Sequence, residues 1–144
     1  MLNMFIVFDL DGTLSDPAHR QPLLDHDPVP WDDFYAACAQ DAPIWHMIEL
    51  YRTLHKAGHQ LEIWTGRADS VEAETRGWLA FYGIHLPVLR MRPYGDHSPD
   101  HILKPSWLRH YAKLPDLIFE DRASVVAAYR ARRLNVAQIA EGNF

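Results

Sequence analysis

MFIVFDLDGTLSD, residues 4–16, passes from an apolar run into two aspartates, Asp9 and Asp11, that stand two positions apart. Side chains at positions i and i+2 of an extended strand point to the same side. Two carboxylates on one side repel each other unless a positive charge lies between them. The stretch therefore predicts a buried strand that leads into a site for a cation, a proton relay or both.

Further strand-like runs follow the first one, and helical patterns separate most of them. The predicted strands are Met4–Phe8, Gln60–Trp64, Leu86–Met91, Asp116–Glu120 and Asn135–Ile139. Apolar residues at helical spacing predict helices from Pro43 to a stop at Gly58, from Val71 to Gly83, from Ser98 with a kink or split at Pro105, and around Val125–Tyr129. Strands that alternate with helices indicate an α/β fold, with a mostly parallel sheet covered on both faces.

The segment 15–41 interrupts this alternation. Residues 15–30 contain four prolines and mixed charges, which predict a loop, and a short helix is expected from Trp31 to about Gln40. Ligands of open parallel sheets bind beyond the carboxyl ends of the strands, and this loop leaves from such an end. The segment is therefore expected near the site, although a surface connection without a role fits the sequence equally well.

Length and composition bound the class of protein. The chain has 144 residues, of which 48% are hydrophobic and 23% charged, so we expect one globular domain over residues 1–144. No window approaches the roughly 20 apolar residues of a membrane span, and no signal-peptide pattern is visible at the N-terminus. The single cysteine, Cys38, excludes an internal disulfide and suits a cytoplasmic protein.

Charge is unevenly distributed along the chain. The net charge is −5, and eight of the nineteen acids lie in the first 41 residues together with one base, Arg20. Long nucleic acids are bound mainly through Lys and Arg that neutralise phosphates. We therefore expect no stable binding of long nucleic acid and no membrane partner. The sequence remains compatible with a local basic pocket in the later part of the chain.

Further candidate site residues end the second and fourth predicted strands, and one more lies on the helix before the fourth strand. They are Thr65, Gly66 and Arg67 in IWTGR, Lys104 in LKP, and Glu120, Asp121 and Arg122 in DLIFEDR. In a parallel sheet the carboxyl ends of the strands meet at one edge. These residues and the aspartate pair are therefore expected to converge on one site.

This order of motifs resembles the haloacid dehalogenase (HAD) superfamily of phosphotransferases. The matching residues are DxDGT at 9–13, Thr65 after the second strand, Lys104, and the acidic pair Glu120-Asp121. The resemblance implies a Rossmann-like three-layer sandwich with a mostly parallel five-stranded sheet. The segments after the first strand and after TGR are short, so no large cap domain is expected.

A closer resemblance is to the 3′-phosphatase domain of bacteriophage polynucleotide kinase, and it covers nearly the whole chain. FEDRASVV at 119–126 resembles that family's DDR-x-x-VV stretch, and the chain ends in a similar Gly-x-Phe. TGR at 65–67 and MRPYGD at 91–96 resemble its arginine-bearing segments. Two positions depart from the pattern: Glu120 stands where an aspartate is usual, and Ser98 where many members carry arginine. The P-loop of the kinase half does not occur.

The resemblance implies a role for each site residue. Asp9 would be the nucleophile that forms an acyl-phosphate, and Asp11 would protonate the leaving oxygen and then activate water. Mg²⁺ would bind to Asp9, Asp121 with Glu120 near, and Asp11 through its backbone carbonyl. Thr65 and Lys104 would complete the catalytic set by holding and neutralising the phosphoryl group. The expected substrate-binding residues are Gly66, Arg67, Arg92 and Arg122.

These expectations describe a Mg²⁺-dependent phosphomonoesterase that acts on a polynucleotide 3′-phosphate or a nucleotide. Alternatives are a phosphatase of free nucleoside monophosphates, a phosphatase of another small metabolite such as a sugar phosphate, and, more remotely, a non-catalytic binding module on the same fold. Aromatic residues after the loop, Trp31, Phe34 and Tyr35, offer either a base-stacking face or simple packing of the short helix. The sequence leaves the oligomeric state open.

Overall fold

The computed structural model describes residues 3–142, so Phe144 of the terminal Gly-x-Phe and the outermost residues of the predicted domain lie outside it. Five parallel strands form one sheet in the order β5-β4-β1-β6-β7. The strands are β1 (Phe5–Phe8), β4 (Gln60–Ala68), β5 (Val88–Arg92), β6 (Leu117–Arg122) and β7 (Val136–Gly142). The predicted strands are thus confirmed, with differences of a few residues at their ends.

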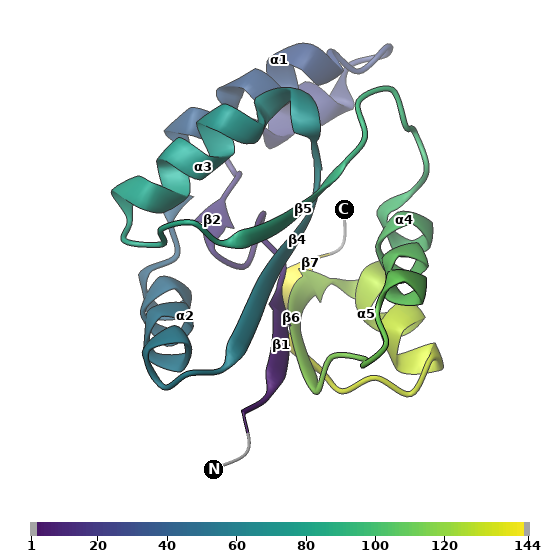
Figure 1. Cartoon of the computed structure of the whole chain (residues 1–144). Helices are drawn as coiled ribbons and strands as arrows, with labels where there is room; N and C mark the ends of the chain where they lie inside the picture. Colours follow the sequence, from purple (N-terminus) through teal and green to yellow (C-terminus); the bar gives the residue numbers. More distant parts are fainter. Residues whose placement is uncertain (1–2, 143–144) are drawn as a thin grey trace.

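The central strand β1 is buried on both faces because its four residues are all apolar. Ile6 and Phe8 pack on the side of α2 (Trp45–Lys56) and α3 (Glu72–Phe81). Phe5 and Val7 pack on the opposite side, against the core that includes residues of α4 (Asp100–Ser106) and α5 (Ala123–Ala131). Figure 1 shows the two helix pairs flanking the sheet, which is the predicted three-layer α/β arrangement.

Two prolines shape the helices in different ways. Pro105 lies inside α4, which ends at Ser106 and continues as a 3-10 turn, Trp107–His110, so the predicted split is confirmed. Pro43 was expected to open a helix, but it lies in the short strand β3 (Ala42–Pro43), and α2 begins two residues later. The correction has a tertiary cause, because β3 pairs antiparallel with β2 (Ser15–Asp16) and closes the base of the 15–41 segment.

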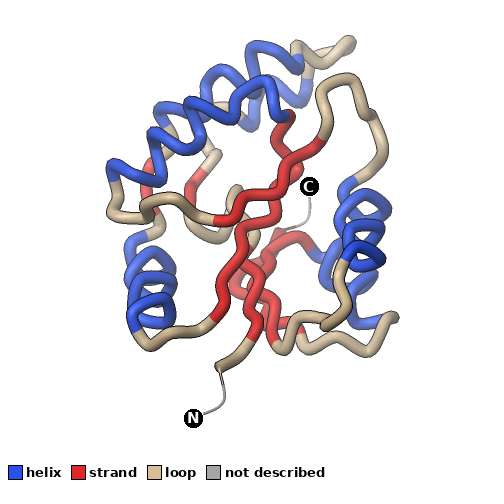
Figure 2. The backbone as a smooth tube through the Cα atoms, in the orientation of Figure 1, coloured by secondary structure: helices blue, strands red, loops and turns tan. Residues whose placement is uncertain are grey.

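The segment 15–41 contains only short elements between β2 and β3. They are the 3-10 turn Gln21–Asp25, the helix α1 (Trp31–Ala36) and the 3-10 turn Ala37–Gln40. Figures 1 and 2 show α1 beyond the carboxyl ends of the strands, on the side toward α3. Within residues 3–142 the chain therefore carries this small segment over the sheet edge and no large cap domain. None of the helices in this range is long and apolar enough to span a membrane.

Candidate active site

Asp9 follows the last residue of the central strand β1 and is held there by the neighbouring strand β6. Its backbone N–H donates to the carbonyl of Phe119 on β6 at 2.9 Å, which continues the sheet ladder one residue beyond β1. The Asp9 side chain is buried, and its Oδ2 accepts a hydrogen bond from Thr13 Oγ1 at 3.1 Å. The DLDGT stretch thus fixes its own first aspartate.

Lys104 joins Asp9 to the acidic pair that ends β6. Its Nζ lies 2.6 Å from Asp9 Oδ1 and 2.9 Å from Glu120 Oε2, and all three side chains are buried. The adjacent carboxylates raise the pKa of the lysine above its ordinary value although burial acts in the opposite direction. A permanently charged ammonium group is therefore built into the floor of the site.

Three carboxylates gather around this lysine. Ligand oxygens of Asp9, Glu120 and Asp121 all lie within 4.8 Å of one another. Burial and the neighbouring carboxylates raise the pKa of Glu120 to about 7 and that of Asp121 to about 9. One lysine does not neutralise three buried carboxylates, so the cluster retains an excess of negative charge when ionised.

Glu120, one of the two residues that depart from the family pattern, uses its longer side chain to contact its own strand end. While Oε2 meets Lys104, Oε1 accepts hydrogen bonds from the backbone N–H groups of Asp121 and Arg122 at 3.1 Å each. The side chain therefore folds back onto its own strand end. Asp121 remains the acidic group that lies directly beside Gly12 in the turn after β1.

Asp11 points away from this carboxylate cluster and meets two buried arginines. Its Oδ1 accepts hydrogen bonds from Arg20 Nη2 at 2.5 Å and from Arg67 Nη2 at 2.7 Å, and Ser15 Oγ donates to it at 3.2 Å. The two guanidinium groups hold the pKa of Asp11 well below its usual range, against the effect of burial. The Asp11 side chain is not part of the three-carboxylate group; a metal contact through its carbonyl stays a prediction.

Another buried carboxylate, that of Asp41, accepts hydrogen bonds from the two arginines that contact Asp11. It accepts from Arg20 Nε at 2.9 Å and Nη2 at 2.8 Å, and from Arg67 Nη2 at 2.9 Å. Arg20 and Asp41 were not among the predicted site residues. One signal pointed to Arg20: it is the single base among the first 41 residues of an acidic segment.

Arg67 has little capacity left for a phosphate. Besides the two aspartates, it donates to Thr75 Oγ1 and Ser15 Oγ at 3.1 Å each, and it is almost fully buried. Thr65 is also fully buried, and its Oγ1 accepts the backbone N–H of Arg67 at 3.1 Å. The structure brings Arg67 to the cavity, where it holds Asp11, whereas Thr65 does not line the cavity and its role on a phosphoryl group stays a prediction.

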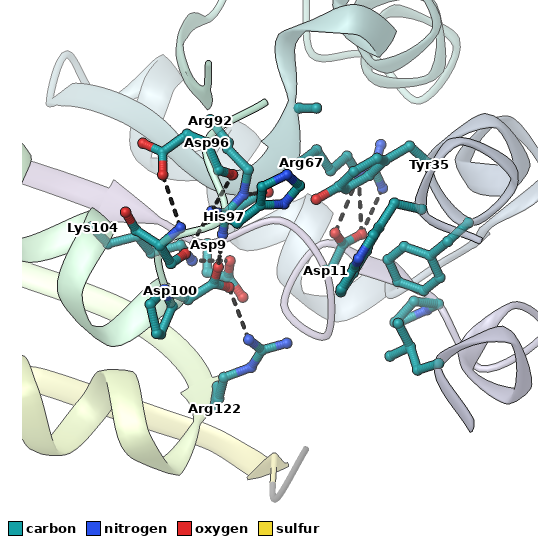
Figure 3. A pocket seen from close by; sticks show the side chains of 18 of the residues that line it. Asp9, Asp11, Tyr35, Arg67, Arg92, Asp96, His97, Asp100, Lys104 and Arg122 are labelled. Atoms are coloured by element: carbon teal, nitrogen blue, oxygen red, sulfur yellow. Dashed lines mark hydrogen bonds and ion pairs between the residues drawn. The ribbon is translucent and has the colours of Figure 1, made fainter. Parts of the chain in front are cut away.

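Arg92 fastens the loop that follows β5 to the rest of the site. Its Nε donates to the Gly66 carbonyl at 2.8 Å, its Nη1 donates to the Ser98 carbonyl at 2.6 Å, and its Nη2 pairs with Asp100. Arg122 Nη1 donates to the other oxygen of Asp100 at 3.0 Å. Asp100 is thus a further site residue that sequence reasoning missed, and Figure 3 shows it between the two arginines.

Gly12 is required where the turn after β1 passes Asp121. Its φ is +83°, and a Cβ at this position would lie 2.0 Å from Asp121 Oδ2. We expect Gly12→Ala to lower the free energy of unfolding by more than Gly58→Ala does. Gly58 has a similar φ of +91° but nothing within 4 Å of its Cβ position, so it serves as the matched control.

The left-handed backbone costs an alanine about 1–2 kcal/mol at either glycine. The clash at Gly12 adds about 1–3 kcal/mol more, as in other overpacked sites. Urea unfolding of both variants measures the difference. Equal destabilisation would show that the Asp121 side chain moves aside with no loss of stability and that the turn is not packed against it.

The strand-end carboxylates together with Lys104, Arg67 and Arg92 border a cavity of about 910 Å³, whereas Arg20 and Asp41 do not line it. Asp9, Lys104, Glu120 and Asp121 line one part of it, and aromatic residues of α1 line another. Figure 3 shows Asp9, Asp100 and Lys104 together on one side of this space, with Asp11, Arg67 and Tyr35 on the other. With a cation at the carboxylates, the arrangement suits a ligand that has one anionic group and an apolar or aromatic portion.

Comparison with known proteins identifies the family of the chain. The family described as "Polynucleotide kinase PNKP phosphatase domain" matches residues 3–144. No curated protein sequence matches the chain. Among solved structures, the Pnkp1/Rnl/Hen1 RNA repair complex contains a similar chain, with a TM-score of 0.84 and 24% identity over 99% of this chain and 44% of that one.

Two further structures have similar folds. A Pnkp1/Rnl/Hen1 complex aligns with a TM-score of 0.81 and 25% identity over 99% of this chain and 48% of the other. The class C acid phosphatase from Bacillus anthracis aligns with a TM-score of 0.71 and 15% identity over 100% of this chain and 69% of the other. The chain thus spans less than half the length of the matched chains in the two Pnkp1/Rnl/Hen1 complexes. With the family match over residues 3–144 and the motif residues assembled in one site, the chain belongs to the polynucleotide kinase PNKP phosphatase domain family, whose members are HAD-type phosphoric monoester hydrolases.

Proposed function

We propose that this chain is a Mg²⁺-dependent phosphatase that removes the phosphate from a polynucleotide 3′-end through a covalent aspartyl-phosphate on Asp9. One observation carries the proposal: a buried Asp9 contacts Lys104 and lies within a group of carboxylates that faces a cavity. A similar chain occurs in a structure named as an RNA repair complex, which favours a nucleic-acid end as substrate.

The residues present fit a magnesium ion. Mg²⁺ prefers oxygen ligands and is bound through a few carboxylates while it keeps several waters. Asp9, Glu120 and Asp121 supply such oxygens within 4.8 Å of one another, with no histidine or cysteine in the group. Burial, and then the neighbouring carboxylates, raise the pKa of Glu120 and of Asp121, and a bound cation would favour their ionised forms. When bound, Mg²⁺ would offset the charge that the nucleophile and the phosphate share.

The chain's own residues account for bond making and proton transfer. An Asp9 oxygen bonds to phosphorus while the bond from phosphorus to the leaving oxygen breaks, and that oxygen takes a proton from Asp11. Water then attacks phosphorus and gives a proton to Asp11, and the bond from phosphorus to Asp9 breaks. Lys104, held within 2.6 Å of Asp9, stabilises the negative charge at the phosphoryl group.

A comparison of substrates tests the proposal. Phosphate release is measured with Mg²⁺ from a 3′-phosphorylated oligonucleotide, a 5′-phosphorylated oligonucleotide, and the nucleoside 3′- and 5′-monophosphates. We expect the highest kcat/KM on the 3′-phosphorylated oligonucleotide. A preference for the free nucleotides would make the chain a nucleotide phosphatase, and no release from any of them would overturn the proposed substrate class.

Removal of the metal should abolish activity. EDTA is expected to reduce phosphate release at least about a hundredfold, because the carboxylates of Asp9, Glu120 and Asp121 and the anionic phosphate would repel one another without a cation. Added Mg²⁺ should restore the rate. Ca²⁺, which is larger and accepts looser geometry, should not restore it. Full activity in excess chelator would contradict the metal-dependent mechanism.

Arg92 should matter through the loop that it holds. We expect Arg92→Lys to lower kcat/KM more than about tenfold, equivalent to about 1.4 kcal/mol. A lysine cannot reach the Gly66 carbonyl, the Ser98 carbonyl and Asp100 together as the guanidinium does.

Arg90→Lys is the matched control for Arg92→Lys. Arg90 lies on the same strand and donates to the Tyr111 hydroxyl, away from the cavity. Steady-state kinetics of both variants, after a check that each is folded, measure the difference. Near-normal efficiency of Arg92→Lys would show that loop geometry at this position does not control the reaction.

A further inference from the structure

The helix α1 carries an aromatic cluster that is not part of the hydrophobic core. Trp31 and Tyr35 are stacked with ring centroids 6.0 Å apart, and Phe34 lies 5.7 Å from Tyr35 edge to face. No residue of α1 is buried, and Trp31 remains 43% exposed. Packing of the short helix therefore does not account for three adjacent aromatic rings.

These rings face the same cavity as the nucleophile. Trp31, Phe34 and Tyr35 all line it together with Asp9, and burial raises the pKa of the Tyr35 hydroxyl above its ordinary value. Figure 3 shows Tyr35 beside Arg67 and Asp11. The aromatic cluster therefore lies next to the residues proposed to act on phosphate.

A fourth aromatic residue approaches from another part of the chain. Tyr94, in the loop after β5, also lines the cavity, and its hydroxyl donates to Asp32 Oδ1 of α1 at 3.3 Å. The Arg20 guanidinium packs over the ring of Phe34, 4.6 Å from its centroid, in a cation–π contact. We call Trp31, Phe34, Tyr35 and Tyr94 the aromatic wall. It is anchored both to the β5 loop and to the arginine that holds Asp11.

The charges around the cavity favour one phosphate over several. Lys104, Arg67 and Arg92 are buried and already engage protein carboxylates. Arg122 pairs with Asp100, and α1 itself carries Asp32 and Asp33 in its first turn. Further phosphates inside the cavity would meet these acidic groups, so the rest of a polynucleotide backbone is expected to extend outside it. A planar, uncharged group would meet the aromatic wall.

We propose that the aromatic wall binds the nucleobase of the nucleotide that carries the scissile phosphate, so that the enzyme recognises a nucleoside attached to the phosphate. The inference rests on the proposed function and narrows its substrate. Stacking on aromatic side chains tolerates any base, because every base has a π face. Binding would therefore depend on the presence of a base and little on its sequence.

The test compares a base-bearing end with a base-less one. The substrates are an oligonucleotide with a 3′-phosphate, the same oligonucleotide with an abasic terminal nucleotide, and the nucleoside 3′-monophosphate. For each enzyme the ratio of kcat/KM on the first substrate to that on the second is measured. Trp31→Ala should lower this ratio about tenfold, and Trp31→Phe, which keeps a ring, should restore most of it.

Trp45→Ala is the matched control. Trp45 is 57% exposed, lies on α2 and contacts Tyr82, away from the cavity. Its removal should leave the ratio as in the unaltered chain. The nucleoside 3′-monophosphate distinguishes binding of the terminal base from binding of the rest of the oligonucleotide. If Trp31→Ala lowers kcat/KM on both substrates, the terminal base itself binds to the aromatic wall. A loss confined to the oligonucleotide overturns recognition of the terminal nucleoside.

Two results would overturn the inference and leave the proposed function intact. One is equal kcat/KM of the unaltered chain on base-bearing and abasic ends. The other is an equal loss of kcat/KM on both ends in Trp31→Ala. Absence of phosphate release from every substrate would instead refute the proposed function. Binding of the same oligonucleotides to the Asp9→Asn variant, measured by fluorescence anisotropy with and without Trp31→Ala, tests the wall independently of turnover. No difference between the two affinities would reject it.

Discussion

Asp9→Asn is expected to reduce phosphate release at least about 10⁴-fold, the scale of the loss when a catalytic nucleophile is removed. An amide oxygen is a far weaker nucleophile than a carboxylate and would not form the acyl-phosphate. The fold should persist, because Lys104 keeps its contact with Glu120 at 2.9 Å. Removal of one charge from the group of three carboxylates also relieves repulsion.

The measurement pairs steady-state turnover with trapping of the phosphorylated enzyme after acid quench. Asp25→Asn is the control, since this aspartate is exposed and lies outside the cavity. It should form the phosphorylated enzyme at the normal rate while Asp9→Asn forms none. Substantial turnover by folded Asp9→Asn would remove Asp9 from the role of nucleophile.

The positions of the site residues along the strands could be predicted from the sequence. The apolar run before Asp9 predicts a buried central strand, and a parallel sheet brings all its strand ends to one edge. This logic is sufficient to bring Glu120 to Asp9. Lys104 lies on helix α4 and not at a strand end, so its contacts with Asp9 and Glu120, which are 95 and 16 residues away in the sequence, depend on how α4 packs on the sheet.

The partners of the arginines could not be predicted in the same way. Arg67 and Arg92 stand at strand ends, where a phosphate clamp and a structural ion pair look alike in sequence. The structure directs Arg67 to Asp11 and Asp41, and Arg92 to Asp100 and backbone carbonyls. A buried guanidinium group requires such acceptors whatever its function, and their identity depends on loops of irregular structure.

The surroundings of Asp11 have a consequence for its chemistry. Arg20 and Arg67 stabilise the carboxylate, so the pKa of Asp11 lies well below its usual range. The carboxylate can accept a proton from water in the second step. To donate a proton in the first step, Asp11 must bind that proton while its contacts with the arginines weaken. We therefore expect proton donation to be the step most sensitive to the leaving group.

Asp11→Asn should consequently impair the two substrate classes unequally. On an oligonucleotide 3′-phosphate, whose leaving oxygen needs a proton, the rate should fall about 10²–10⁴-fold. With p-nitrophenyl phosphate, whose leaving group needs none, the variant should still form the phosphorylated enzyme in a burst and then hydrolyse it slowly, because an amide cannot activate water. Asn also accepts only weakly from Arg20 and Arg67, so the stability of the folded variant is measured alongside. Rapid-quench kinetics decide the assignment: an unchanged rate on the oligonucleotide, or loss of the burst in a folded variant, would exclude Asp11 as the acid and base.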